Sequence, residues 1–485
     1  MSRRVAADAA VAAVVATVAP LCLLQAPNAI AWAMASVGPA AGGPQGPAAV
    51  LRAAGLALPA MAAIGGVAAL AATRLRAWPV LLAGLVTMAV ADVLGVSAHT
   101  VAQIGTDRML HGLAAGVAMP AALALAWERS PGARPLLAAL WSAAAVTGLV
   151  AATAAVRARL SGGDWHAALA PYPWLTGTAL TVAALYAVLA DGRGSPRGPG
   201  RLGARTDAAH ERAQLAVLAV PAIGLSLLSV AVTYRQPAAL LATAAVSILI
   251  LYGVAAAASA DKLVGGRLCF PLIAAVAGLV VAPTAGAVTG LRALGSPAAG
   301  ITGPGIARPV APATGHLGGP AWLPLAATAG SALAGAAIAL ALRHRPRAVV
   351  LVGLALAAEG LVAAFAAGPF AGAAVLAGVG VPLAAGLAAA ITAALAGATA
   401  AGALSGVTLL LAGLMTGYLA AGSMQVRMVL RLAAGSAAGT GARGALAGAA
   451  GRCELAGAGS IVIVMAAIFI AGRACRAGAA GRGRG

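Results

Sequence analysis

Two carboxylic acids stand inside long apolar stretches of this sequence. Asp92 lies in the segment AVADVLG, and Glu359 lies in the segment LALAAEG. A charged side chain is costly in an apolar environment, so each residue is a candidate for a functional role. Burial also favours a protonated carboxyl group, and a proton carrier needs such a group. Alternatively, the carboxyl group of each residue stays permanently protonated or is bonded to a neighbouring helix and has no functional role.

An arginine and a histidine open a third apolar stretch, RMLHGLAAGVAMP. Arg108, Gly112, Gly116 and Pro120 recur every four residues, so on a helix they form one slowly turning stripe. The glycines allow close contact with another helix. Arg108, at the outer end of the stripe, either reaches a cavity or extends to the membrane interface. One turn away, His111 is expected to be neutral and hydrogen-bonded.

The composition defines the class of protein that holds these residues. The chain has 485 residues, of which 62% are hydrophobic and 9% are charged, against about 45–50% and about 25% in soluble domains. These values exclude a soluble globular domain and a disordered chain, and they do not favour nucleic-acid binding despite a net charge of +20. Apolar blocks of about 20 residues match the hydrocarbon thickness of a bilayer, and such blocks must be helical. We therefore predict an all-α, polytopic membrane protein with about fourteen transmembrane helices and the lipid bilayer as its partner.

Segments rich in glycine, proline or charge divide the chain. Residues 191–214 form a charged linker, residues 291–320 form a nearly uncharged outer loop, and residues 423–454 form a loop or an interfacial helix. The stretch from 371 to 421 is almost unbroken, so its division into spans stays open. The predicted organisation is a six-helix bundle (1–190), the linker (191–214), two inserted helices (215–258), a second six-helix bundle (259–472) and a basic tail (473–485).

The basic residues indicate the orientation. If the spans alternate from a cytoplasmic N-terminus, most of the arginines fall on the inner side, including those of the linker and of the C-terminal tail. This asymmetry predicts a multi-pass protein of the cell membrane with both termini in the cytoplasm.

No constellation of residues indicates an enzyme. The glycine pattern at 439–444 follows no strand, so it does not predict a dinucleotide site, and no cysteine or histidine pair has the spacing of a metal site. A polyprenyl-dependent glycosyltransferase is the strongest enzyme alternative, but the first outer loop, 36–51, lacks the acidic residues that it would need. We expect no catalytic residues, no metal and no cofactor.

Several short patterns resemble, in order, one family. The stretch from Arg108 to Pro120 is similar to the fourth-helix motif of the major facilitator superfamily. The supporting patterns are TRLRAWP (73–79), Asp164-Trp165 followed by Pro171 and Pro173, ALGSPAAG (293–300), RHRPR (343–347) and the glycine-rich run with Gly406, Gly413 and Gly417. The branch that they resemble is that of the fourteen-helix drug–proton antiporters.

The resemblance implies two six-helix bundles around a central cavity, with two extra helices between them. It further implies efflux of small lipophilic or cationic compounds by alternating access, coupling to protons, and a monomeric chain. Gly406, Gly413 and Gly417 would serve helix packing.

The sequence also departs from this family. Gln25 stands where the family has an aspartate in the first helix, and glutamine cannot exchange a proton. The family's glutamine before Gly112 is His111, and the turn at 73–79 has no aspartate. The alternative function is therefore a transport-inactive membrane protein on the same scaffold, either an assembly partner or a lipid-binding protein.

Overall fold

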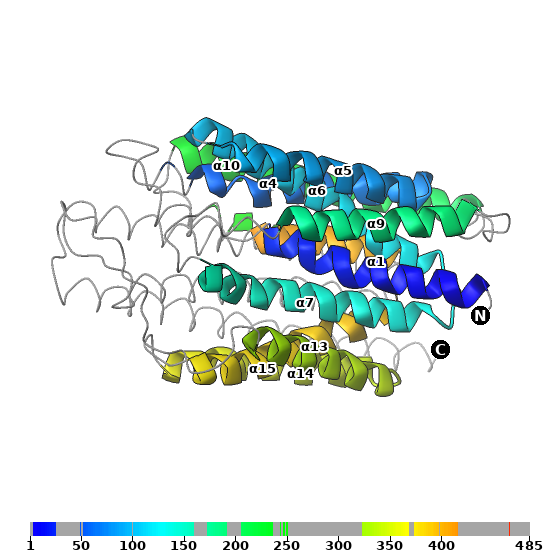
Figure 1. Ribbon diagram of the computed structural model, residues 1–485. Coiled ribbons are helices and arrows are strands. Elements are labelled where there is room, and N and C mark those ends of the chain that lie inside the picture. The colour runs from blue at the N-terminus through cyan, green and yellow to red at the C-terminus, as the bar shows by residue number, and fades with distance from the viewer. Residues whose placement is uncertain are drawn as a thin grey trace, which may run out of the picture.

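The structure is a layered bundle of roughly parallel helices (Figure 1). The computed structural model describes residues 3–25, 52–98, 100–159, 172–191, 205–235, 323–367, 373–396 and 398–415, together with residues 49, 243, 246, 247, 249, 250 and 465. The helices are α1 (Arg3–Gln25), α4 (Ala57–Arg74), α5 (Ala77–Val96), α6 (Val101–Trp127), α7 (Arg134–Arg159), α9 (Tyr172–Asp191), α10 (Arg205–Arg235), α13 (Leu323–Ala341), α14 (Pro346–Ala367) and α15 (Ala373–Ala396). A further helix, Ala400–Met415, follows α15.

Helix length and composition show an integral membrane protein. Within the described ranges, six helices are long and apolar enough to cross a bilayer, and five shorter apolar helices accompany them. Local signals mark the helix ends. At the start of α6, Thr100 accepts a hydrogen bond from the backbone N–H of Gln103, whose side chain accepts one from the N–H of Thr100. This capping box satisfies two backbone donors that the helix itself leaves open.

The two halves of the chain repeat one packing unit. In the first half α6 packs on both α4 and α5, and in the second half α15 packs on both α13 and α14. Glycines make these contacts close in both units. A Cβ atom on Gly84 of α5 would lie 2.9 Å from the backbone nitrogen of Ala118, and one on Gly353 of α14 would lie 2.6 Å from the carbonyl oxygen of Gly386. Such repeats are the building plan of many transporter folds.

The halves meet along two lines. On one line, α7 packs against α13 and α15. On the other, α4 packs against α10 and the helix Ala400–Met415, where a Cβ on Gly66 would crowd Ala219 and Thr408. α1 lies inside the first half, against α6, α7 and α9.

The described helices lie in the predicted apolar blocks, with one difference. The predicted linker 191–214 is too long, because α10 already begins at Arg205; residues 205–214 contain no glycine or proline and are rich in good helix formers. The stretch 371–421 divides into α15 and the helix Ala400–Met415. The second inserted helix, the last span, the outer loop 291–320, the segment 423–454 and the tail 473–485 lie largely or wholly outside the described residues.

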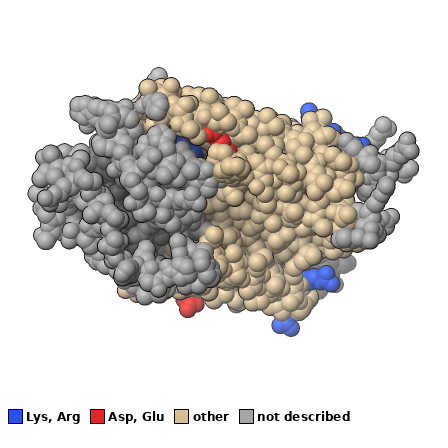
Figure 2. Space-filling view, in the orientation of Figure 1, with Lys and Arg blue, Asp and Glu red and all other residues tan. Residues whose placement is uncertain are grey.

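Charge is distributed unevenly along the bundle. Most of the basic side chains in Figure 2 gather towards the end of the molecule at which α1 begins. The basic residues of the turns at this end are Arg74, Arg76, Arg129, Arg134, Arg343, Arg345 and Arg347. The opposite end holds the buried polar residues described next.

Candidate functional site in the first half of the chain

Three helix ends meet at the site. Asp92 lies four residues before the end of α5, His111 lies in the third turn of α6, and Thr176 lies in the second turn of α9. α5 packs against both other helices. At 1.5 Å per residue, Asp92 lies about 6 Å from the end of its helix.

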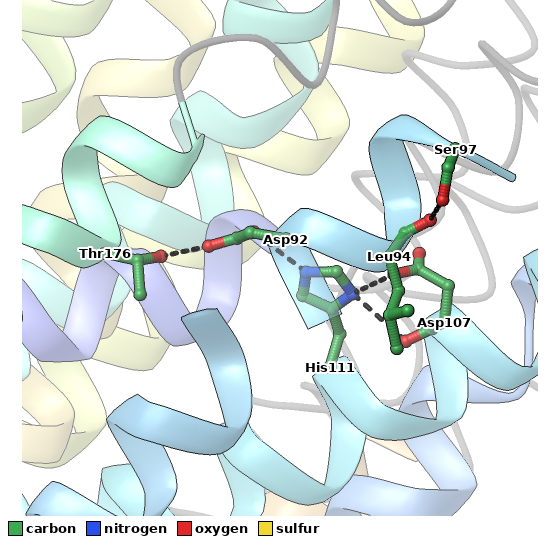
Figure 3. Close-up of polar contacts among 6 residues, drawn as sticks. All are labelled: Asp92, Leu94, Ser97, Asp107, His111 and Thr176. Carbon is green, nitrogen blue, oxygen red and sulfur yellow. Dashed lines mark hydrogen bonds and ion pairs between the residues drawn. The ribbon is translucent and has the colours of Figure 1, made fainter. Parts of the chain in front are cut away.

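A chain of polar contacts joins these residues (Figure 3). Thr176 donates its hydroxyl hydrogen to Oδ2 of Asp92 over 2.5 Å. Oδ1 of Asp92 lies 2.9 Å from Nε2 of His111. On the other side of the ring, Nδ1 of His111 lies 3.1 Å from the backbone oxygen of Asp107 and 3.2 Å from Oδ1 of its carboxylate. The histidine therefore sits between two carboxylates.

All of these groups are removed from solvent. Asp107 is 2% exposed, Arg108 is 1%, His111 is 4% and Asp92 is 6%. Of the two interpretations of Arg108, the structure excludes extension to the membrane interface, because the side chain is buried. With His111 protonated, the two aspartates are balanced by one imidazolium and one guanidinium, which reduces the cost of burying the group.

Gly95 of α5 makes room for the second carboxylate. A Cβ atom at this position would lie 3.0 Å from Oδ1 of Asp107 and 3.3 Å from its Cγ. Any larger residue would press on the carboxylate that faces His111. The close approach of α5 and α6 is thus part of the site.

Sequence reasoning missed Asp107 and Thr176. Asp107 is four residues before His111, which puts both on one helix face, so the pattern DRMLH contained a usable signal. For Thr176 no such signal exists, because its partner Asp92 is on a helix 84 residues away in sequence. The prediction of a neutral His111 considered only the positive charge of Arg108. The carboxylates of Asp92 and Asp107 also lie beside the ring, and their negative charges oppose the effect of Arg108.

The other predicted coupling residues do not join this group. Glu359 is exposed on the surface of α14, a helix that packs mainly on α15. Gln25 is the last residue of α1, but its side chain is outside the described part. The structure thus brings Asp92, Arg108 and His111 into one region of α5 and α6 and places Glu359 elsewhere.

The predicted packing glycines differ among themselves. A Cβ on Gly112 would overlap the backbone of Ala57, and one on Gly116 would lie 2.5 Å from the carbonyl oxygen of Met61. Both contacts hold α6 against α4, with Pro120 buried further along the same helix. At Gly406 no described atom lies within 4 Å of a Cβ position, so close packing does not explain this glycine. Gly413 is buried in the helix Ala400–Met415, and Gly417 is beyond the described residues.

Within the described ranges, no three histidine, cysteine or carboxylate side chains are arranged to hold a metal ion.

A small apolar pocket lies at the opposite end of α6. Its lining residues are Ala72, Thr73, Leu123, Ala124, Trp127, Glu128, Ala400 and Leu404.

Comparisons with known proteins address the fold. No protein-family model matches the sequence, and no curated protein matches it. Solved structures do resemble it. A peptide transporter POT in complex with alafosfalin has a TM-score of 0.57 at 14% identity, covering 95% of this chain and 94% of that one. The human organic anion transporter MFSD10 has a TM-score of 0.51 at 16% identity, covering 95% and 99%.

A third solved structure also resembles the chain. The proton:xylose symporter XylE, of the major facilitator superfamily, has a TM-score of 0.52 at 15% identity, covering 94% of this chain and 95% of that one. At such identities the likeness concerns the fold alone. The chain shares the all-helical fold of these three transporters.

Proposed function

We propose that the protein is a secondary active transporter that works by alternating access and uses the Asp92–His111 pair to bind a proton. The observation that carries this proposal is the buried chain from Thr176 through Asp92 and His111 to Asp107. It lies within a fold of two repeated halves, which supports a rocking movement of one half against the other.

A structural role alone is a poor explanation of this chain of contacts. Ionisable residues in membrane spans are costly, and they mark proton relays or substrate paths more often than they stabilise a bundle. A buried ion pair is also weak support for stability, because apolar residues of similar volume often serve as well. Four ionisable side chains, Asp92, Asp107, Arg108 and His111, are buried here together.

The proposed substrate is a small lipophilic or cationic compound, moved out of the cell across the cell membrane. Sequence resemblance to the drug–proton antiporters supports this choice. The structural neighbours bind chemically different molecules, namely peptide-like compounds, an organic anion and a sugar, and so they leave the substrate class open. The proposed orientation, with both termini in the cytoplasm, rests on the arginine-rich turns at one end of the bundle.

One observation favours the alternative, a transport-inactive protein on this scaffold. Of the two carboxyl groups that the sequence offered as proton carriers, Glu359 is turned to the outside of α14. Among the described residues, the candidates for proton exchange then lie in the first half of the chain. Transport itself distinguishes the two functions.

The test is reconstitution into liposomes with ethidium as a lipophilic cationic probe and a pH dye in the lumen. A transporter moves ethidium faster when a proton gradient is imposed, and the gradient dissipates with the probe. Protein-free liposomes and a protonophore give the two baselines. Equal probe movement with and without protein, in the presence and absence of the gradient, would favour the inactive scaffold.

A further inference from the structure

The geometry points to Asp107 as a positioning residue that fixes the tautomer of His111, so that one exchangeable proton is held between His111 Nε2 and Asp92 Oδ1 and bonds α5 to α6. This inference goes deeper into the site of the proposed function. Its consequence for transport rests on that function, whereas the position of the proton does not.

Nδ1 of His111 faces Asp107. Its two neighbours are the backbone oxygen and Oδ1 of Asp107, at 3.1 and 3.2 Å. A carbonyl oxygen and an ionised carboxylate only accept hydrogen bonds. Nδ1 must therefore carry a hydrogen in both the charged and the neutral ring.

The tautomer determines what Nε2 can do. With the first hydrogen on Nδ1, a neutral ring leaves Nε2 as a bare acceptor. Oδ1 of an ionised Asp92 is an acceptor as well, and it lies 2.9 Å from Nε2. Two acceptors at this distance repel each other, so the observed contact requires one more proton between them. That proton gives either an imidazolium beside a carboxylate or a neutral ring beside a carboxylic acid.

Thr176 restricts where this proton lies. Its hydroxyl group donates to Oδ2 of Asp92, so Oδ2 is used as an acceptor. A proton on Asp92 is then directed to Oδ1, on the line to His111.

The ionisable groups that act on the ring are Asp107 and Arg108 on its own helix and Asp92 on α5, while α9 contributes the neutral Thr176. The acidic residue of α1, Asp8, is paired with Arg129 near the other end of the bundle.

The proton therefore works as a removable link between helices. With it, α5 is bonded to α6 through His111 and to α9 through Thr176. When the proton leaves, the bond to α6 becomes a repulsion and the bond to α9 remains. Loading and release of one proton thereby change how the outer end of α5 is held.

The test is nitrogen-15 NMR of histidine-labelled protein in nanodiscs, with no substrate and no gradient. The His111 signals are identified by their loss in His111→Gln. As pH rises, we expect the ring to pass from the imidazolium to the neutral form with hydrogen on Nδ1. Asp107→Ala keeps the backbone oxygen that is hydrogen-bonded to Nδ1 but removes the carboxylate beside the ring, so we expect the other tautomer, with hydrogen on Nε2, to become detectable and the titration midpoint to fall. Asp107→Asn keeps an acceptor and is expected to restore the tautomer but not the midpoint.

Asp92→Asn supplies the second half of the test. Its amide can donate to Nε2 at every pH, so we expect the neutral Nδ1–H form to persist to lower pH than in the unmodified protein. Asp8→Asn removes a carboxylate at the other end of the bundle and should leave the His111 signals unchanged. A neutral ring with hydrogen on Nε2 in the unmodified protein, or a His111 titration indifferent to both Asp107→Ala and Asp92→Asn, would overturn the inference. Failure of transport with this NMR pattern intact would count against the proposed function only.

Discussion

The indole N–H of Trp127 donates a hydrogen bond to the backbone oxygen of Ala398, 3.3 Å away and 271 residues distant in sequence. Trp127 ends α6, in the first half of the chain, and Ala398 precedes the helix Ala400–Met415 in the second. Both halves also line the small pocket beside this bond. An alternating-access movement that opens this end of the bundle must break the bond between Trp127 and Ala398.

Trp127→Phe should therefore favour opening at this end. The substitution keeps an aromatic ring and removes only the hydrogen-bond donor. A hydrogen bond of this kind contributes about 0.5–1.5 kcal/mol net to stability. We expect maleimide to label Thr73→Cys, in the pocket wall, roughly threefold to tenfold faster than when Trp127 is present, as such a free-energy difference implies. Trp141→Phe is the matched control, because the Trp141 indole N–H is buried without an acceptor among the described residues. Equal labelling in both variants would mean that the bond does not hold this end closed.

Substitution of Gly116 tests the contact between α6 and α4. A Cβ there would lie 2.4 Å from a methyl group of Ile64 and 2.5 Å from the carbonyl oxygen of Met61, which is backbone and cannot turn aside. We expect Gly116→Ala to lower the melting temperature in detergent and Gly116→Leu to prevent folding, because the helices must separate. At Gly177 a Cβ meets no described atom within 4 Å, so Gly177→Ala is the control. Normal expression and transport by Gly116→Leu would exclude close packing here.

Glu128 should make stability depend on pH. Burial raises the pKa of this carboxyl group above its ordinary value of 4.5, although the hydrogen bond from the Ala77 N–H and the charges of Arg76 and Arg129 act in the opposite direction. The folded protein then holds a proton that the unfolded chain has lost. The resulting stability is present below pH 4.5 and disappears as the pH rises through the raised pKa.

Glu128→Gln removes this titration and keeps an oxygen that can accept from Ala77. Thermal unfolding in detergent across this pH window should show the unmodified protein losing stability relative to the variant as pH rises. The opposite slope in the difference would show that Arg76 and Arg129 outweigh burial.

The orientation is tested by labelling from outside intact cells, with the native cysteines replaced. We expect a membrane-impermeant thiol reagent to miss Gly200→Cys, in the linker, and to modify Gly305→Cys, in the predicted outer loop. The arginine-rich turns at one end of the bundle are the reason, because such turns stay in the cytoplasm. Modification of Gly200→Cys from outside would reverse the orientation.

Local properties of the sequence predicted the helices but not the side-chain partners. The first apolar block of the sequence, residues 5–24, coincides with α1, which runs from Arg3 to Gln25, because hydropathy is a property of the local sequence. Local hydropathy does not determine the rotation of a helix about its own axis, which decides the side chains that face its neighbours. Apart from Arg347 in its first turn and Glu359, α14 is apolar on all faces, so no periodicity indicates that Glu359 points outwards.

The candidate site shows the same limit. Asp107 and His111 share a helix face that the sequence alone predicts, given the helix. The contacts of Asp92 with His111 and Thr176 depend instead on how three helices pack. A sequence of alanine, glycine and leucine contains little to determine that packing before the backbone is known.

Gln25 leaves no exchangeable proton at the position where the resembling family has an aspartate, so coupling requires another group. Asp92→Asn should abolish gradient-driven transport to the level of protein-free liposomes, because its amide occupies the place of the proton permanently. Exchange of substrate across the membrane should be largely retained, since exchange requires no net proton movement. Glu359→Gln should transport as the unmodified protein does, because Glu359 is exposed on α14 and is not part of the contacts around Asp92. The measurement is proton-driven uptake and exchange in proteoliposomes for each variant and for the double variant. Loss of coupling in Glu359→Gln alone would move the proton site to the second half of the chain, and full proton-driven transport by the double variant would show that coupling uses neither group.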